Sequence, residues 1–103
     1  MKDLQKKVQV FVKKHNLTHS PEISALDLIS EIGEVAKEIL KSGDYGKNTP
    51  QKTTEMKGEL GDALYSLITL ANSLDIDLEE ALNMVLEKYE KRIKKTDSSG
   101  SGR

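Results

Sequence analysis

Apolar residues recur at helical spacing in four segments of this chain, and that periodicity constrains the fold more than any other feature. The segments cover about residues 1–16, 20–43, 53–73 and 77–95, with polar stretches between them. Apolar positions three and four residues apart line one face of an α-helix, whereas a strand requires alternation. The pattern predicts an all-α fold, a four-helix-type bundle subunit.

Composition along the chain predicts where this domain ends. We expect a single all-α domain over residues 1–96. Residues 97–103 are rich in Gly and Ser and lack apolar periodicity, so they are predicted to form a disordered tail.

Local signals mark the starts of three helices. Ser20, followed by proline, is suited to cap the second helix, and Gly43 is a natural stop for it. The third start stays open between Thr49, which precedes a proline, and the pair at 53–54. Asp77 opens a capping-box pattern before the last helix.

Two of the segments carry carboxylates beside their apolar face. At about 100° per residue, the apolar residues of the second segment fill an arc from about 40° to 180° from Glu31, and Glu34 falls on the other side of Glu31. The third segment repeats this layout around Glu59, with Asp62 beside it. The local sequences are similar as well, with "EIGE" in the second segment and "ELGD" in the third. If the two apolar arcs pack together, the four carboxylates meet along one edge of the interface.

Carboxylates at such a junction need a counter-charge. Like charges one turn apart on a single helix cost only about 0.2–0.5 kcal/mol per pair, but closely packed charges on two helices repel more strongly. Protonation, water or a cation would relieve this repulsion, and hard divalent cations take oxygen ligands. We therefore predict a Mg²⁺ site, with Mn²⁺ as the alternative ion, at Glu31, Glu34, Glu59 and Asp62. A solvated acidic face is the alternative interpretation.

Composition also limits the classes of partner. Sixteen Lys and Arg against seventeen Asp and Glu give a net charge of −1, so no net positive field exists to bind a nucleic acid polymer. Zero cysteines exclude disulfides and thiolate chemistry. No apolar run approaches the roughly 20 residues of a membrane span, and we expect a cytoplasmic protein without membrane contact. One Phe and no Trp give a thin core, so burial in a homodimer or homotetramer is expected.

The two motifs resemble those of the MazG-like branch of the all-α nucleoside triphosphate pyrophosphatases. The likeness covers about residues 25–92, from "EIGE" and "ELGD" to "LDIDLEEAL" and "EKYEKR". It implies a Mg²⁺-dependent hydrolase that cleaves nucleoside triphosphates between the α and β phosphates and removes unwanted nucleotides. It also implies that the four carboxylates are metal ligands and catalytic groups, and that Lys88 and Arg92 contact the triphosphate.

Further side chains are candidates for substrate binding. Glu38 continues the first carboxylate stripe, and Tyr65 and His15 are candidate contacts to the base. His19 is a further candidate of this kind, the surface interpretation is favoured for both histidines, and Phe11 is expected in the core. Two alternatives to the main hypothesis stay open: a phosphoribosyl-ATP pyrophosphohydrolase, and a non-enzymatic helical module whose acidic stripes bind a basic partner.

Overall fold

The computed structural model describes residues 2–98, which form four α-helices and no strand. The helices are α1 (Lys2–Lys14), α2 (Pro21–Ser42), α3 (Thr54–Ser73) and α4 (Leu78–Ser98). The all-α prediction is confirmed. Residues 99–103 of the predicted tail lie outside the described residues, while α4 itself continues to Ser98.

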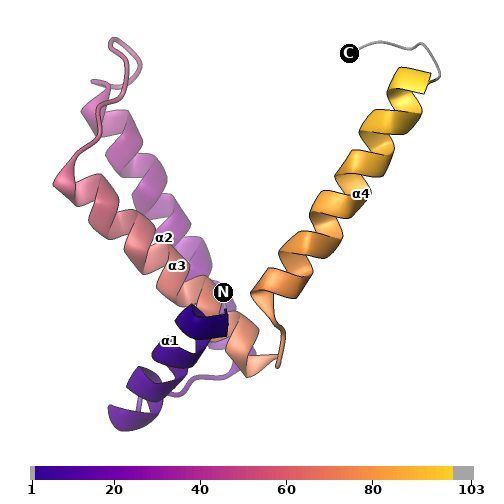
Figure 1. The fold of residues 1–103 in the computed structure, drawn as a ribbon. Coiled ribbons are helices and arrows are strands. Elements are labelled where there is room, and N and C mark those ends of the chain that lie inside the picture. Colours follow the sequence, from indigo (N-terminus) through magenta and orange to yellow (C-terminus); the bar gives the residue numbers. More distant parts are fainter. Residues whose placement is uncertain (1, 99–103) are drawn as a thin grey trace.

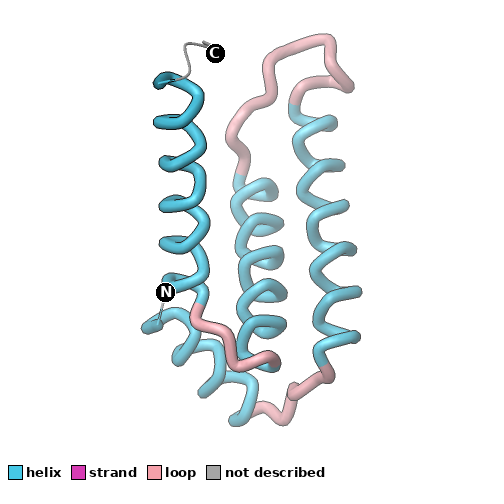
Figure 2. The backbone as a smooth tube through the Cα atoms, turned by 90° about the vertical axis from the view of Figure 1, so that its right-hand side faces the viewer, coloured by secondary structure: helices cyan, strands magenta, loops and turns pink. Residues whose placement is uncertain are grey.

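α2 and α3 form a helical hairpin, α1 packs at one end of it, and α4 projects away from it. Figure 1 shows α2 and α3 side by side and antiparallel, with α1 at the end opposite their connecting loop. α3 packs against both α1 and α2. α4 diverges from the hairpin after a short loop that follows α3. Figure 2 shows this loop at the lower end of α4. The helix that completes the predicted bundle therefore has most of its length unpacked within the chain.

Side chains cap the helices where the sequence predicts. The Ser20 hydroxyl accepts a hydrogen bond from the backbone N–H of Ile23 at 3.3 Å, and Pro21 is the first residue of α2. The Thr53 hydroxyl accepts from the N–H of Met56 at 2.9 Å, which decides the start of α3 between the two candidates. Asp77 caps α4, because its side-chain Oδ1 accepts hydrogen bonds from the backbone N–H groups of Glu79 and Glu80.

Gly43 ends α2 as predicted, but a close approach rather than a left-handed backbone requires the glycine. Its φ is −99°, which any residue can adopt. A Cβ atom here would lie 2.7 Å from the carbonyl oxygen of Asn48 and 3.3 Å from the ring of Pro50. The connection to α3 therefore folds directly over this glycine.

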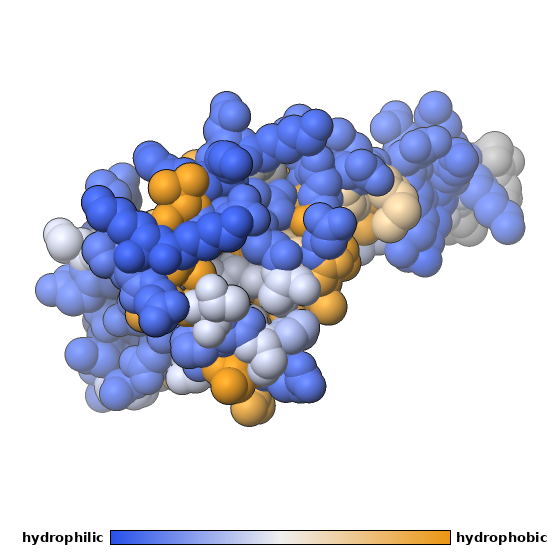
Figure 3. All heavy atoms as spheres, turned by 90° about the horizontal axis from the view of Figure 1, so that it is seen from below, coloured by the Kyte–Doolittle hydropathy of each residue, from blue (hydrophilic) through white to orange (hydrophobic). Residues whose placement is uncertain are grey.

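The chain buries little apolar surface by itself. Among the described residues, Ile68 and Ala71 are the buried hydrophobic side chains. The radius of gyration is 17.7 Å, against about 13 Å for a compact domain of about 100 residues. Figure 3 shows apolar side chains exposed among the charged ones. Phe11 is 47% exposed, so its predicted place in the core is wrong, because the packing of α1 against α3 leaves this ring partly uncovered.

No described helix combines the length and the apolar character that a membrane crossing needs. α2, for example, is 22 residues long but carries the charged stripe along one side. The amphipathic helices instead direct their apolar faces toward one another or toward solvent.

Two glycine-to-alanine substitutions should change stability in opposite directions. Gly43→Ala should lower the free energy of unfolding by about 1–3 kcal/mol, because its methyl group collides with backbone. Gly58→Ala in α3 should raise it by about 1 kcal/mol, since the added methyl meets nothing within 4 Å and alanine favours helix. Urea titrations of both variants test this pair, and equal effects would contradict the close approach at Gly43.

Candidate metal centre and adjoining cavity

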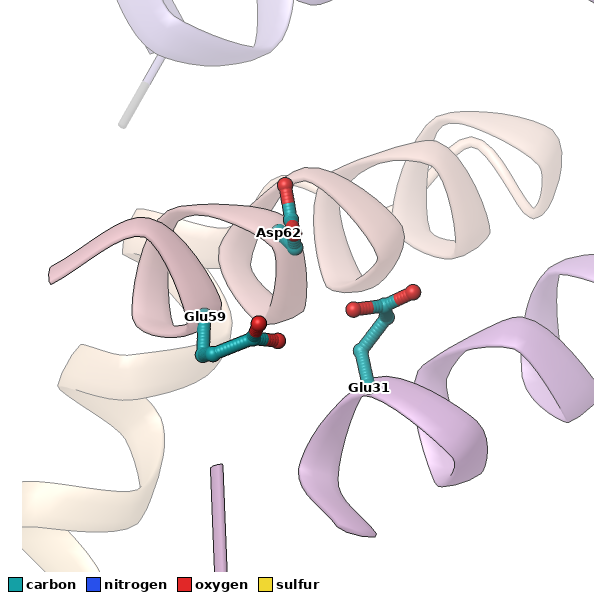
Figure 4. Close-up of side chains that lie close together, drawn as sticks. All are labelled: Glu31, Glu59 and Asp62. Atoms are coloured by element: carbon teal, nitrogen blue, oxygen red, sulfur yellow. The ribbon is translucent and has the colours of Figure 1, made fainter. Parts of the chain in front are cut away.

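Three carboxylates from two helices converge at the α2–α3 interface. Glu31 projects from α2, and Glu59 and Asp62 project from α3 (Figure 4). One carboxylate oxygen of each lies within 4.8 Å of the other two. The spacing of three residues puts Glu59 and Asp62 on the same side of α3, and the packing of the apolar arcs brings that side to Glu31.

The cluster is electrostatically unfavourable as it stands. Glu31 and Glu59 are half-buried and Asp62 is exposed. Partial desolvation raises the pKa of Glu59 above its ordinary value, and the negative charges of Asp62, Glu34, Glu31 and Glu38 raise it further. Among the described side chains, no Lys or Arg forms an ion pair with the three clustered carboxylates.

The donor set suits a small hard cation. Mg²⁺ is bound through oxygens at about 2.1 Å in an octahedron, so its opposite ligands lie about 4.2 Å apart. Oxygens within 4.8 Å of one another need only small side-chain rotations to reach that size. Three carboxylates would also leave coordination positions for water or for substrate phosphate.

The other two predicted acids of α2 lie at the margin of this cluster. Glu34 is exposed and lies outside the group of three, although its charge acts on Glu59. The Glu38 side chain is 16% exposed, and one of its oxygens lies 4.0 Å from the Lys41 ammonium. The structure therefore brings three of the four predicted ligands together and leaves Glu34 beside them.

A cavity of about 320 Å³ opens beside the carboxylates, between α1, α2 and the second half of α3. Asp27, one turn before Glu31, and Ser66, one turn after Asp62, both line it. Tyr65, a predicted contact to the base, lines it as well. Apolar atoms make up most of the lining surface, although most of the remaining lining residues carry a polar group: Gln9, Val12, Lys13, Leu17, Thr18, His19, Ser24, Thr69, Asn72 and Ser73.

His15 stands outside this lining but is connected to it through aromatic rings. Its imidazole lies 4.6 Å from the Phe11 ring, and Phe11 lies 6.3 Å from Tyr65 in an edge-on arrangement. His15 is exposed. The surface interpretation of His15 therefore agrees with its position, and Tyr65 and His19 are the predicted aromatic groups at the cavity.

Comparison with known proteins identifies the family of this chain. The model of the MazG nucleotide pyrophosphohydrolase domain matches residues 19–96. YpjD of Bacillus subtilis (strain 168) is 40% identical over 99 residues, which cover 91% of this chain and 86% of YpjD. The gene 37 protein of Mycobacterium phage L5 is 34% identical over 80 residues, covering 75% of this chain and 69% of the phage protein.

Solved structures agree with this match. The crystal structure of the Bacillus-conserved MazG protein, a nucleotide pyrophosphohydrolase, superposes with a TM-score of 0.72 at 37% identity, covering 85% of this chain and 86% of that one. The crystal structure of YpjD from Bacillus subtilis gives a TM-score of 0.74 at 40% identity, covering 89% and 94%.

The chain belongs to the MazG family. It is a nucleotide pyrophosphohydrolase, which makes it a hydrolase rather than a helical interaction module. The carboxylate cluster lies within the matched MazG region, and so do α2, α3 and most of α4.

The predicted phosphate-binding cations of this MazG chain do not reach the carboxylates within one chain. Lys88 and Arg92 lie on α4, which diverges from the hairpin (Figure 1). Both approach the Tyr89 ring instead, at 5.7 and 5.8 Å from its centre. Any contact between these cations and a substrate at the cluster therefore requires a second chain or a movement of α4.

Sequence reasoning missed the buried hydroxyl groups of the cavity. Ser24 is 2% exposed and Ser66 is 6% exposed. Ser24 lies seven residues before Glu31, and Ser66 lies seven residues after Glu59. Seven residues are about two helical turns, so on antiparallel helices both serines fall toward the same end of the hairpin. This pairing was a usable signal once the two carboxylate motifs had been aligned.

Glu59→Gln should stabilise the metal-free protein at neutral pH. Because the pKa of Glu59 is raised on folding, the folded state binds its proton more tightly than the unfolded chain does. Ionised Glu59 therefore opposes folding above its folded-state pKa, and this penalty disappears as the pH falls to the ordinary glutamate range. Urea midpoints in the presence of a chelator should be higher for the variant at neutral pH and should converge with the unchanged protein in acid.

Proposed function

We propose that this MazG protein hydrolyses nucleoside triphosphates between the α and β phosphates in a Mg²⁺-dependent reaction. The products would be a nucleoside monophosphate and pyrophosphate. The observation that carries the proposal is the convergence of Glu31, Glu59 and Asp62 from two packed helices, without a basic partner among the described side chains. The family supports the class of reaction, and the donor set supports the cation.

In this reaction the clustered carboxylates would hold the cation, and Glu34 would join them through water or directly. A bound Mg²⁺ neutralises phosphate oxygens and lowers the pKa of water. The oxygen of a water molecule forms a bond to the α phosphorus, the bond from that phosphorus to the bridging oxygen breaks, and pyrophosphate leaves. A glutamate of the cluster accepts the proton of the water.

The cavity would hold the nucleoside. Its lining offers hydroxyl and amide groups that can donate and accept hydrogen bonds, and the Tyr65 ring offers an apolar surface. Since Asp27 and Ser66 lie one turn from the carboxylates, a nucleoside seated there would direct its phosphates toward the cation. Glu38 would act at the margin of this site, on the side of the cluster away from Ser24.

Pyrophosphate release from a panel of nucleotides tests this function. The unchanged protein with Mg²⁺ should release pyrophosphate from at least one triphosphate, whereas Glu59→Gln should lower kcat/KM by at least about 100-fold. Glu22→Gln removes an exposed acid at the start of α2 and should keep the original rate. Preferential turnover of phosphoribosyl-ATP would support the alternative substrate, and no turnover of any nucleotide would refute the proposal.

We further propose that the working form is a homodimer or homotetramer. α4 carries Leu82, Leu86, Tyr89 and Ile93, which are 43–54% exposed and spaced by four, three and four residues. This spacing lines one face of a helix in the manner of a bundle seam. On α2, Leu26 and Ile29 are 66% and 69% exposed. Apolar surface on this scale is typical of subunit contacts, and such a contact would let α4 of one copy bring Lys88 and Arg92 to another.

Leu86→Glu should weaken this association by at least about tenfold, which corresponds to about 1.4 kcal/mol. The reason is that the carboxylate would have to be desolvated in an apolar seam. Met84→Glu is the matched control, because Met84 is 67% exposed and lies about 160° away around α4. Sedimentation over a range of concentrations measures both variants. A monomeric unchanged protein would contradict the proposed assembly.

A further inference from the structure

A buried amide group connects α1 to the start of α4. Gln5 is 9% exposed, although it belongs to a helix rich in lysine. Its Nε2 donates to the Asn72 side-chain oxygen at 2.9 Å and to the carbonyl oxygen of Ile76 at 2.8 Å. Its Oε1 accepts from the backbone N–H of Leu78 at 2.8 Å. The side-chain amide of Asn72 also donates to the backbone carbonyl oxygen of Gln5 at 3.0 Å.

The backbone determines which way this amide faces. A backbone N–H can only donate and a carbonyl oxygen can only accept. The Gln5 oxygen must therefore face Leu78, and the Gln5 nitrogen must face Ile76. With the nitrogen so directed, Asn72 is left with its oxygen toward Gln5 Nε2 and its nitrogen toward the Gln5 carbonyl. Every group in the network has a partner only in this arrangement.

The network also completes the cap of α4. The first N–H groups of a helix have no partner inside it. Asp77 satisfies those of Glu79 and Glu80. The N–H of Leu78, the first residue of α4, is satisfied by Gln5 from a different helix. The first turn of α4 is thereby tied to α1 and to the end of α3.

Among the described residues, α4 makes few packing contacts that could fix its direction. α4 diverges from the hairpin along its length (Figure 1), and its packing on the other helices is slight. We propose that Gln5 and Asn72 are positioning residues that set the angle at which α4 leaves the hairpin. Through that angle they present Lys88 and Arg92 for contact with the triphosphate. This second part rests on the proposed function, whereas the first does not.

Spin labels test the angle directly. The chain contains no cysteine, so Lys37→Cys on α2 and Lys94→Cys on α4 provide two labelled positions on exposed helix surface. Doubly labelled chains are mixed with an excess of unlabelled chains, so that distances within one chain dominate. Pulsed electron paramagnetic resonance then gives the distribution of distances between the label on α2 and the label on α4.

Two variants remove the network by different means. Gln5→Glu keeps an acceptor for Leu78 but turns a carboxylate oxygen toward the Ile76 and Asn72 oxygens. Gln5→Met keeps the length of the side chain and removes all of its hydrogen bonds. Gln51→Glu is the control, since it makes the same chemical change at an exposed loop residue. Circular dichroism verifies that each protein retains its helix content, and the milder Gln5→Met carries the test if Gln5→Glu does not fold.

The distance distribution should be narrow in the unchanged protein and in Gln51→Glu, and at least about twice as broad in the Gln5 variants. An equally narrow distribution in a folded Gln5 variant would overturn the positioning role. Kinetics tests the second part: KM for the triphosphate should rise about tenfold while kcat stays within about twofold, as for loss of a contact made equally in ground and transition states. A broadened distance distribution with an unchanged KM would support the positioning role of Gln5 and Asn72 but overturn its link to substrate binding. Absence of any turnover would count against the proposed function alone.

Discussion

The packing of α2 against α3 is the constraint on which the site depends, because it places Glu31 beside Glu59 and Asp62, which lie in a different part of the sequence. Burial of Ile68 and Ala71 favours this packing, while the repulsion among Glu31, Glu59 and Asp62 opposes it. The connection that folds closely over Gly43 limits how far the two helices can separate. A cation among the three carboxylates would turn the repulsion into an attraction between the helices, so metal binding and stability of the hairpin are expected to be coupled.

The carboxylate cluster was largely predictable because two simple geometric facts determine it. Residues three apart share a side of a helix, and two apolar arcs with the same adjacent stripe bring those stripes together when they pack antiparallel. What the pattern leaves open is the axial offset between the helices. That offset decides that Glu31 rather than Glu34 faces Glu59 and Asp62. A shift of α2 along α3 by one helical turn would bring Glu34 into the place of Glu31. Such a shift leaves the match between the two apolar faces nearly unchanged.

Other differences between prediction and structure come from contacts that are distant in sequence. Periodicity tells which side of α1 is apolar, but it does not tell how much surface a single neighbour covers, and so Phe11 was wrongly expected in the core. Gln5 is the opposite case, since a glutamine among lysines suggests solvent. Its partners lie 67 to 73 residues away, beyond the reach of any local pattern. The helical state of α4 follows from its own residues, whereas its direction follows from these amide contacts.

The cavity and the carboxylate cluster are built on the same two helices, and this gives the site a fixed length. Ser24 and Glu31 are seven residues apart on α2, as are Ser66 and Glu59 on α3, which corresponds to about 10 Å along each helix. Because the helices are antiparallel, both intervals run in the same direction in space, from the buried hydroxyls to the acidic end. A rigid interval of this kind favours ligands that present a polar organic group at one end and a charged group at the other. A nucleotide has that form, and discrimination by length then needs no loop to close over it, since the helical rise itself sets the distance.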